Sequence, residues 1–77
     1  MISDRLKRII LRELGLDDWQ FTAETTAAMV PGWDSLNHAR VIAAVEDAYG
    51  IRFATRDIIR LETVAQLQAL VDQKTTG

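Results

Sequence analysis

Apolar residues recur at helical spacing in three separate stretches of the chain, and this periodicity limits the fold to a helical one. In the first stretch, Ser3 and Asp4 are good capping residues, and Gly15 is placed to end a helix in a left-handed conformation. The apolar positions of this stretch share one helix face: Ile2, Leu6, Ile9, Ile10 and Leu14. We therefore expect a first amphipathic helix that ends at about Leu14.

The other two stretches predict the second and the last helix. The second helix should run from about Ser35 to Tyr49 and end at Gly50. Its apolar stripe, which we assign to the core, consists of Val41, Ile42, Val45, Ala48 and Tyr49. The last helix opens with Thr63 and Gln66, whose spacing is typical of a capping box. Its core face consists of Val64, Leu67, Leu70 and Val71.

The segments between these helices complete the expected architecture. Residues 16–33 lack a sustained period and end in Pro-Gly, so we expect a long loop. Apolar side chains should anchor that loop on the helices, namely Leu16, Trp19, Phe21, Met29 and Val30. A short helical segment from Thr55 to Arg60 should turn Ile58 and Ile59 inward. The sequence thus predicts an all-α fold, a small four-helix bundle with three longer helices, one short helix and a long first loop.

Size and composition narrow the functional classes. With 77 residues the chain has room for one domain over 1–77, in which we expect 73–77 to be a frayed tail. It has no cysteine and one histidine, so we expect no disulfide and no metal site, and the 48% hydrophobic residues must supply the stability. The net charge of −2 argues against nucleic acid as a partner, and no apolar run has the length of a membrane span. We expect a cytoplasmic monomer.

The stretch G-W-D-S-L at residues 32–36 stands where the second helix should begin, and it poses a question about Ser35. Asp34 and Ser35 are both typical helix caps, because a side-chain oxygen satisfies free N–H groups of the first turn. Ser35 and His38 would also be neighbours at i and i+3. Nucleophilic catalysis further needs a group that orients the histidine and donors for an oxyanion, and neither is evident. We therefore expect no enzyme, and a half-buried His38 at the helix edge.

A different chemistry suits Ser35 better. A helix N-terminus favours an attached anion through its backbone N–H groups and its dipole, so a phosphate joined to this hydroxyl would be well placed. A face of the second helix separate from the core stripe carries small apolar residues ringed by charge, which suits protein docking. That face contains Leu36, Ala39, Arg40, Ala43, Glu46 and Asp47.

These features resemble the acyl carrier proteins. The D-S-L signature of that family is matched by Asp34, Ser35 and Leu36, with its frequent preceding glycine at Gly32. The stretch ELGL at residues 13–16 resembles the end of the family's first helix. Residues 41–49 resemble its apolar second helix, and Glu-Thr-Val at 62–64 resembles the start of its last one. The resemblance covers nearly the whole chain.

The resemblance implies a carrier without catalysis of its own. A phosphopantetheinyl transferase would move 4′-phosphopantetheine from coenzyme A onto the Ser35 hydroxyl, with Mg²⁺ held mainly by the transferase. Asp34 would assist that reaction electrostatically. The arm's thiol would hold cargo as a thioester, loaded by an acyl- or aminoacyl-loading ligase, synthase or transferase. The docking face named above matches the family's partner-binding face, and four residues lie where a bound chain would be sheltered: Val45, Ile59, Leu61 and Val64.

Two departures from the family pattern refine this expectation. Asn37 and Arg40 stand where carriers of primary fatty-acid synthesis are often acidic, and Ala48 dilutes the charge further. Because Arg40 would repel a basic patch on a partner, we hypothesise a specialised carrier, for example of secondary metabolism. The alternative from another class is an unmodified helical adaptor. A helix-turn-helix DNA reader using Arg56 and Arg60 is more distant, because Glu62 and Asp72 oppose them.

The two tryptophans receive different interpretations. Trp19 is expected to pack the loop. Trp33 either packs against the start of the second helix, which we favour, or lies beside the arm and shapes which partners approach.

Overall fold

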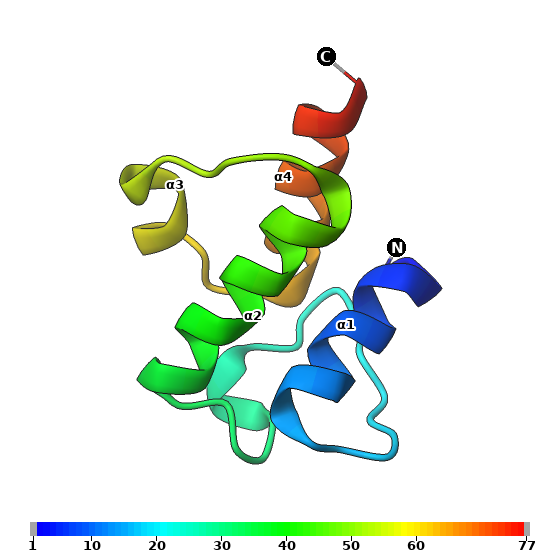
Figure 1. Ribbon diagram of the computed structural model, residues 1–77. Helices are drawn as coiled ribbons and strands as arrows, with labels where there is room; N and C mark the ends of the chain where they lie inside the picture. Colours follow the sequence, from blue (N-terminus) through cyan, green and yellow to red (C-terminus); the bar gives the residue numbers. More distant parts are fainter. Residues whose placement is uncertain (1, 77) are drawn as a thin grey trace.

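The computed structural model describes residues 2–76 and contains four α-helices joined by loops (Figure 1). Helix α1 spans Asp4–Leu14 and α2 spans Ser35–Tyr49. The short α3 covers Thr55–Ile59, and α4 covers Val64–Thr76. A single 3₁₀ turn, η1, lies at Ala27–Met29 within the long first loop. The described residues form no strand, which confirms the all-α bundle.

The predicted helix ends are confirmed. Ser3 is the N-cap of α1, where its hydroxyl accepts a hydrogen bond from Leu6 N at 3.3 Å. Gly15 and Gly50 end α1 and α2 with φ of 69° and 66°, the left-handed region that glycine enters without a steric penalty. Ile51 N then donates to Glu46 O at 3.0 Å, which satisfies a carbonyl at the end of α2.

The core lies between the helices. Helices α1 and α2 pack side by side in opposite directions (Figure 1). The apolar stripes predicted for α1, α2 and α4 supply most of the buried cluster, which consists of Leu6, Ile9, Ile10, Val30, Trp33, Val41, Ile42, Val45, Phe53, Val64, Leu67 and Val71. Burial of this apolar surface is the main force that holds a chain without disulfides together.

Helix α4 begins at the predicted capping box and runs further than expected. Thr63 Oγ1 accepts from Gln66 N, and Gln66 Oε1 accepts from Thr63 N, both at 3.2 Å. The segment 73–76, expected to be frayed, is helical in the structure. Thr75 Oγ1 donates to Val71 O at 2.9 Å, and Lys74 Nζ lies 3.9 Å from a carboxylate oxygen of Asp57, so this last turn is tied both to its own helix and to α3. Residue 77 lies outside the described range.

The long first loop packs over the helices with one exception. Val30 is buried, and Leu16, Trp19 and Phe21 pack against the core. Met29 was expected to be an anchor, but its side chain is 61% exposed. The η1 turn directs Met29 outward, and Val30 takes the inward position. The loop also reaches the start of α4, where Val64 N donates to Thr25 O at 2.9 Å.

Helix α3 turns only one of its two isoleucines inward. Ile58 packs against the core, whereas Ile59 is 76% exposed, so the expectation for Ile59 was wrong. Adjacent helical residues point about 100° apart, and a five-residue helix has only one face against the core.

Among the described residues, no helix is long and apolar enough to cross a membrane.

Candidate functional site

Asp34, and not Ser35, caps α2. The Asp34 backbone is extended, and its Oδ1 accepts a hydrogen bond from Asn37 N at 2.8 Å. Ser35 is therefore the first helical residue, and its side chain is exposed. Within residues 2–76, the Ser35 hydroxyl has no hydrogen-bond partner. Asp34 is therefore the N-cap of α2, and the hydroxyl of Ser35 is available for modification.

A tight turn presents this pair of residues. Gly32 adopts φ of 78°, which a side chain would make costly. Its carbonyl accepts from Asp34 N at 3.1 Å and from Asn37 Nδ2 at 2.6 Å. The side chain of Asn37 thus fixes the turn that leads into α2, which gives this departure from the family pattern a structural role.

The start of α2 has donors that suit a phosphate attached to Ser35. The first N–H groups of a helix lack partners inside it, and the helix dipole places partial positive charge there. Asp34 occupies the N–H groups of Asn37 and His38 through its carboxylate and its carbonyl. The N–H groups of Ser35 and Leu36 belong to the first turn of α2, where they have no partner within the helix, and the exposed hydroxyl of Ser35 lies beside them. These donors are compatible with a phosphate attached to Ser35.

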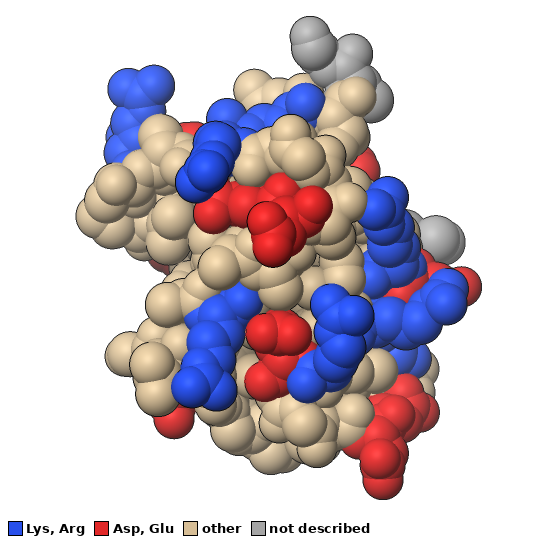
Figure 2. Space-filling model, viewed as in Figure 1, with Lys and Arg blue, Asp and Glu red and all other residues tan. Residues whose placement is uncertain are grey.

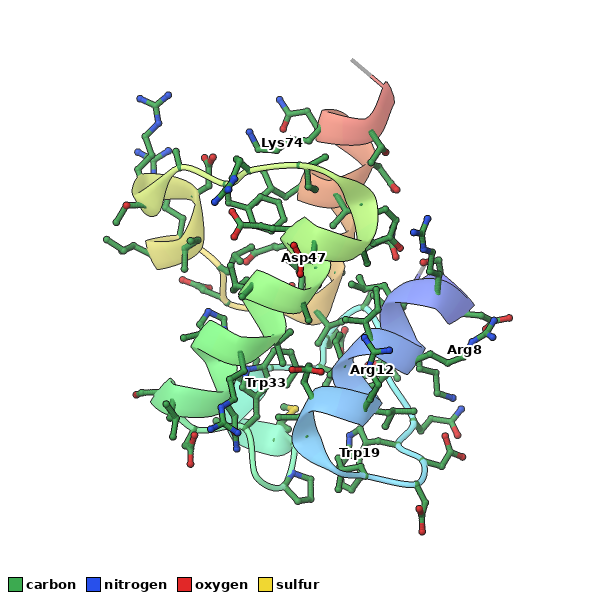
Figure 3. The ribbon with its side chains drawn as sticks, in the orientation of Figure 1. Arg8, Arg12, Trp19, Trp33, Asp47 and Lys74 are labelled. Carbon is green, nitrogen blue, oxygen red and sulfur yellow. The ribbon has the colours of Figure 1, made fainter. Side chains whose placement is uncertain are left out.

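Trp33 and His38 form a pair immediately behind Ser35. The indole Nε1 donates to His38 Nδ1 at 3.0 Å, and the ring centroids are 6.0 Å apart. Trp33 is only 9% exposed and belongs to the core, as the packing interpretation predicts (Figure 3 shows it beside the N-terminal half of α2). It also lies on the wall of the groove that contains Ser35, so it is close to the proposed arm as well. His38 is half-buried, as expected. Burial lowers the pKa of His38 below its ordinary value, and an acceptor Nδ1 requires the neutral ring.

This pairing removes the serine–histidine alternative. The Nδ1 atom of His38 is already engaged by Trp33, and no group in the described chain orients the imidazole toward Ser35. In that same part of the chain, no cluster of His, Asp or Glu has the arrangement of a metal site.

The predicted docking face is mostly exposed. Leu36 is 64% exposed, and Ala39, Arg40, Ala43 and Asp47 also face solvent. Glu46 is the exception, because it is half-buried and its Oε2 accepts from Phe53 N at 2.9 Å. It therefore holds the segment after α2 in place, a role that the sequence did not reveal.

A groove along α1 extends this face. It is lined by Arg12, Glu13, Arg40, Ala43, Ala44, Asp47 and Ala48. Arg12 lies on the side of α1 near α2, whereas Arg8 points away (Figure 3). Lys, Arg, Asp and Glu side chains are interspersed over the face formed by α1 and α2 (Figure 2). Arg40 therefore belongs to a surface of mixed charge.

Three of the four residues proposed to shelter a bound chain meet in the core. Val45 and Val64 are buried there and Leu61 packs against that core, whereas Ile59 is exposed. Leu61 and Val64 line a narrow hollow of about 20 Å³ together with Ala27, Trp33, His38, Glu62, Thr63 and Leu67. That volume is about enough for one water molecule. Trp33 and His38 were not predicted to line this hollow. The signal in the sequence was their five-residue spacing across the start of α2, which allows the two rings to meet.

The chain matches a protein family described as phosphopantetheine attachment site over residues 4–71. Among solved structures, it is similar to a holo acyl carrier protein from Geobacter metallireducens, determined in solution by NMR. The two share 36% sequence identity and superpose with a TM-score of 0.88. The match covers 95% of this chain and 84% of the other.

Proposed function

The chain belongs to the phosphopantetheine-attachment family and is an acyl carrier protein, not an enzyme, and we propose that Ser35 is the residue that carries its 4′-phosphopantetheine. The observation that supports this assignment is the exposed, unpartnered hydroxyl of Ser35 at the first position of α2, directly after the capping Asp34. When bound, the arm supplies the thiol on which cargo is held as a thioester.

The residues around Ser35 have separable roles in the attachment reaction. Ser35 Oγ forms the new bond to phosphorus as the bond to the adenosine bisphosphate part of coenzyme A breaks, and the hydroxyl proton leaves to a base on the transferase. Asp34 directly precedes Ser35, and the hydrogen bond from Asn37 N to its Oδ1 fixes the carboxylate at the start of α2. Its negative charge favours the approach of Mg²⁺ that the transferase holds. The N–H groups of Ser35 and Leu36 then face the attached phosphate.

The docking face of Leu36, Ala39, Arg40, Ala43, Glu46 and Asp47 is proposed to meet the transferase and the enzymes that load and use the cargo. Leu36 supplies an exposed apolar contact next to the arm. Glu46 contributes less than its neighbours, because its carboxylate is already bonded to Phe53 N. The loading enzyme selects a fatty acyl, polyketide or aminoacyl cargo.

Arg40 is proposed to make this a specialised carrier. It lies on a surface of mixed charge with Arg12 and Asp47. A partner with a uniformly basic patch would meet repulsion from these arginines, whereas a partner with interspersed acidic groups would not.

The attachment is tested by mass spectrometry. The protein is incubated with coenzyme A, Mg²⁺ and a promiscuous phosphopantetheinyl transferase. The expected result is a gain of one phosphopantetheine in the wild type and none in Ser35→Ala. Ser35→Ala is expected to unfold at the same temperature as the wild type, because the hydroxyl supports no other contact. An unmodified wild type with several transferases would contradict the proposal and favour a helical adaptor.

Reversal of the charge at Arg40 tests the proposed specialisation. In Arg40→Glu, turnover with an enzyme that accepts housekeeping fatty-acid carriers should rise, and the gain should shrink as salt screens the charges. Arg56→Glu on α3 is the matched control, since it makes the same charge change away from the docking face. Equal turnover in Arg40→Glu and the wild type would contradict the specialised role.

A further inference from the structure

Two hollows meet at the start of α2. An open groove of about 380 Å³ carries Ser35 and Asp34 on its wall, together with Ala27, Ala28, Trp33, His38 and Leu61. Behind it lies the narrow hollow of about 20 Å³, which continues to Val64 and Leu67. The two share Ala27, Trp33, His38 and Leu61. These four residues therefore form the wall that the Ser35 groove shares with the inner hollow.

Trp33 and His38 belong to the wall between the two hollows, and a hydrogen bond joins their side chains. Trp33 is the largest side chain of the four, and its Nε1 donates to His38 Nδ1 at 3.0 Å. His38 is itself held on α2, where its backbone N donates to Asp34 O at 2.8 Å. Displacement of the indole would leave a partly buried N–H donor and acceptor unpaired, which costs more free energy than the bond itself contributes. Packing of Trp33 in the core opposes the same movement.

The residues beyond this boundary are mainly apolar. Leu61, Val64 and Leu67 line the inner hollow, with Glu62 and Thr63 also on its wall. The lining suits a hydrocarbon chain, but the available volume does not. An acyl chain therefore enters this hollow only if a residue of its wall moves, and Trp33 is the largest residue of the shared wall.

We propose that Trp33, held by its hydrogen bond to His38, is a specificity-determining residue that keeps the acyl chain of the cargo outside the helix bundle. The inference rests on the proposed attachment at Ser35. Long acyl chains then gain no stabilisation from burial in the bundle, so short acyl groups, which need no such burial, are the favoured cargo. Longer chains stay exposed in the Ser35 groove, where water and partner enzymes reach them.

The test varies chain length on the intact protein. A promiscuous transferase with acetyl-, butyryl- or octanoyl-coenzyme A installs the loaded arm, and mass spectrometry confirms each product. Cleavage of each thioester by hydroxylamine is then compared with cleavage of the same acyl-pantetheine free in solution. In the wild type, the ratio of the two rates should be the same for all three chains, and the unfolding temperature should not depend on chain length.

Trp33→Leu should open the boundary. In this variant, octanoyl cleavage should slow about tenfold relative to acetyl cleavage, as expected for burial of about two methylene groups. The octanoyl form should also unfold at a higher temperature than the acetyl form. Trp33→Phe retains most of the bulk but lacks the N–H donor, so its protection should be intermediate. Trp19→Leu, in the part of the loop near the end of α1 (Figure 3), should behave as the wild type.

The outcomes separate this inference from the proposed function. Absence of any mass gain would overturn the attachment at Ser35 and the inference with it. A mass gain followed by strong protection of octanoyl in the wild type would overturn the inference alone. Equal cleavage of all chains in both Trp33→Leu and Trp33→Phe would also overturn it, because Trp33 would then not be the barrier.

Discussion

Trp33 Nε1 donates a hydrogen bond to His38 Nδ1 at 3.0 Å and so joins the end of the long loop to the first turns of α2. The bond requires an unprotonated Nδ1. Partial burial of His38 also favours the neutral ring, because a charged group loses hydration in the protein interior. The conformation behind the proposed attachment site is therefore linked to the protonation of one residue.

This linkage predicts a pH dependence of stability. The pKa of His38 is lowered in the folded state from 6.5, so the unfolded chain binds more protons in the window between the two pKa values. The contribution to the free energy of unfolding is fully present above about pH 6.5 and is lost as pH falls through the folded pKa. Urea denaturation of the wild type and of His38→Gln at several pH values measures this contribution as the difference between their profiles. Asp34 and Glu62 each line a hollow together with His38, and both carboxylates are present in the wild type and in the variant, so the difference between the profiles reports on His38. Parallel profiles from pH 8 to pH 5 would contradict the prediction.

Replacement of Asp34 should separate its capping role from its charge. Asp34→Ala removes the acceptor of the Asn37 N–H bond and should lower the free energy of unfolding by about 1 kcal/mol. Asp34→Asn keeps a capping oxygen, so its stability should stay close to that of the wild type. Both variants should be modified more slowly by the transferase. Modification of Asp34→Asn at the wild-type rate would show that capping alone is required.

Glu46 and Asp47 should respond differently to the same truncation. Glu46→Ala removes the acceptor of the Phe53 N–H bond and should cost about 1.5 kcal/mol, because the group is partly buried and the bond involves a charge. Asp47→Ala removes an exposed carboxylate and should change the free energy of unfolding by less than about 0.5 kcal/mol. Chemical denaturation of the two variants checks this. Equal losses would mean that the Phe53 contact does not stabilise the fold.

Gln68 should be the most important polar side chain of α4 for stability. It is 6% exposed, its Oε1 accepts from Ser3 N at 2.8 Å, and its Nε2 donates to Asp72 Oδ1 at 2.8 Å. Gln68→Ala leaves the Ser3 N–H without this acceptor and should cost about 2 kcal/mol. Gln73→Ala, an exposed change on the same helix, is the matched control and should have little effect. A loss in Gln68→Ala no larger than in Gln73→Ala would contradict this role.

Much of the fold is local and was therefore predictable. The bounds of α2, the capping box at Thr63 and the glycine stops at Gly15 and Gly50 all follow from contacts within a few residues along the chain. The exposed Ile59 and Met29 were missed, because hydrophobicity predicts burial only where the fold has room for the side chain. Residues 73–76 are helical, and Lys74 there lies 3.9 Å from a carboxylate oxygen of Asp57, a contact between segments far apart in the sequence that local patterns do not reveal.

The sequence by itself determined the helices, the family and the candidate attachment residue, since periodicity, caps and the D-S-L pattern are all written in short stretches of chain. The cap of α2 is also a local contact, although the sequence offered both Asp34 and Ser35 for it and the structure shows that Asp34 accepts the bond. Only the tertiary structure decided that Trp33 bonds to His38 and lies on the wall of the inner hollow. These outcomes depend on atoms from η1, α2 and the start of α4 that meet only after the loop has folded back over the bundle. Their geometry is a property of the packed core, and no single segment of the sequence contains it.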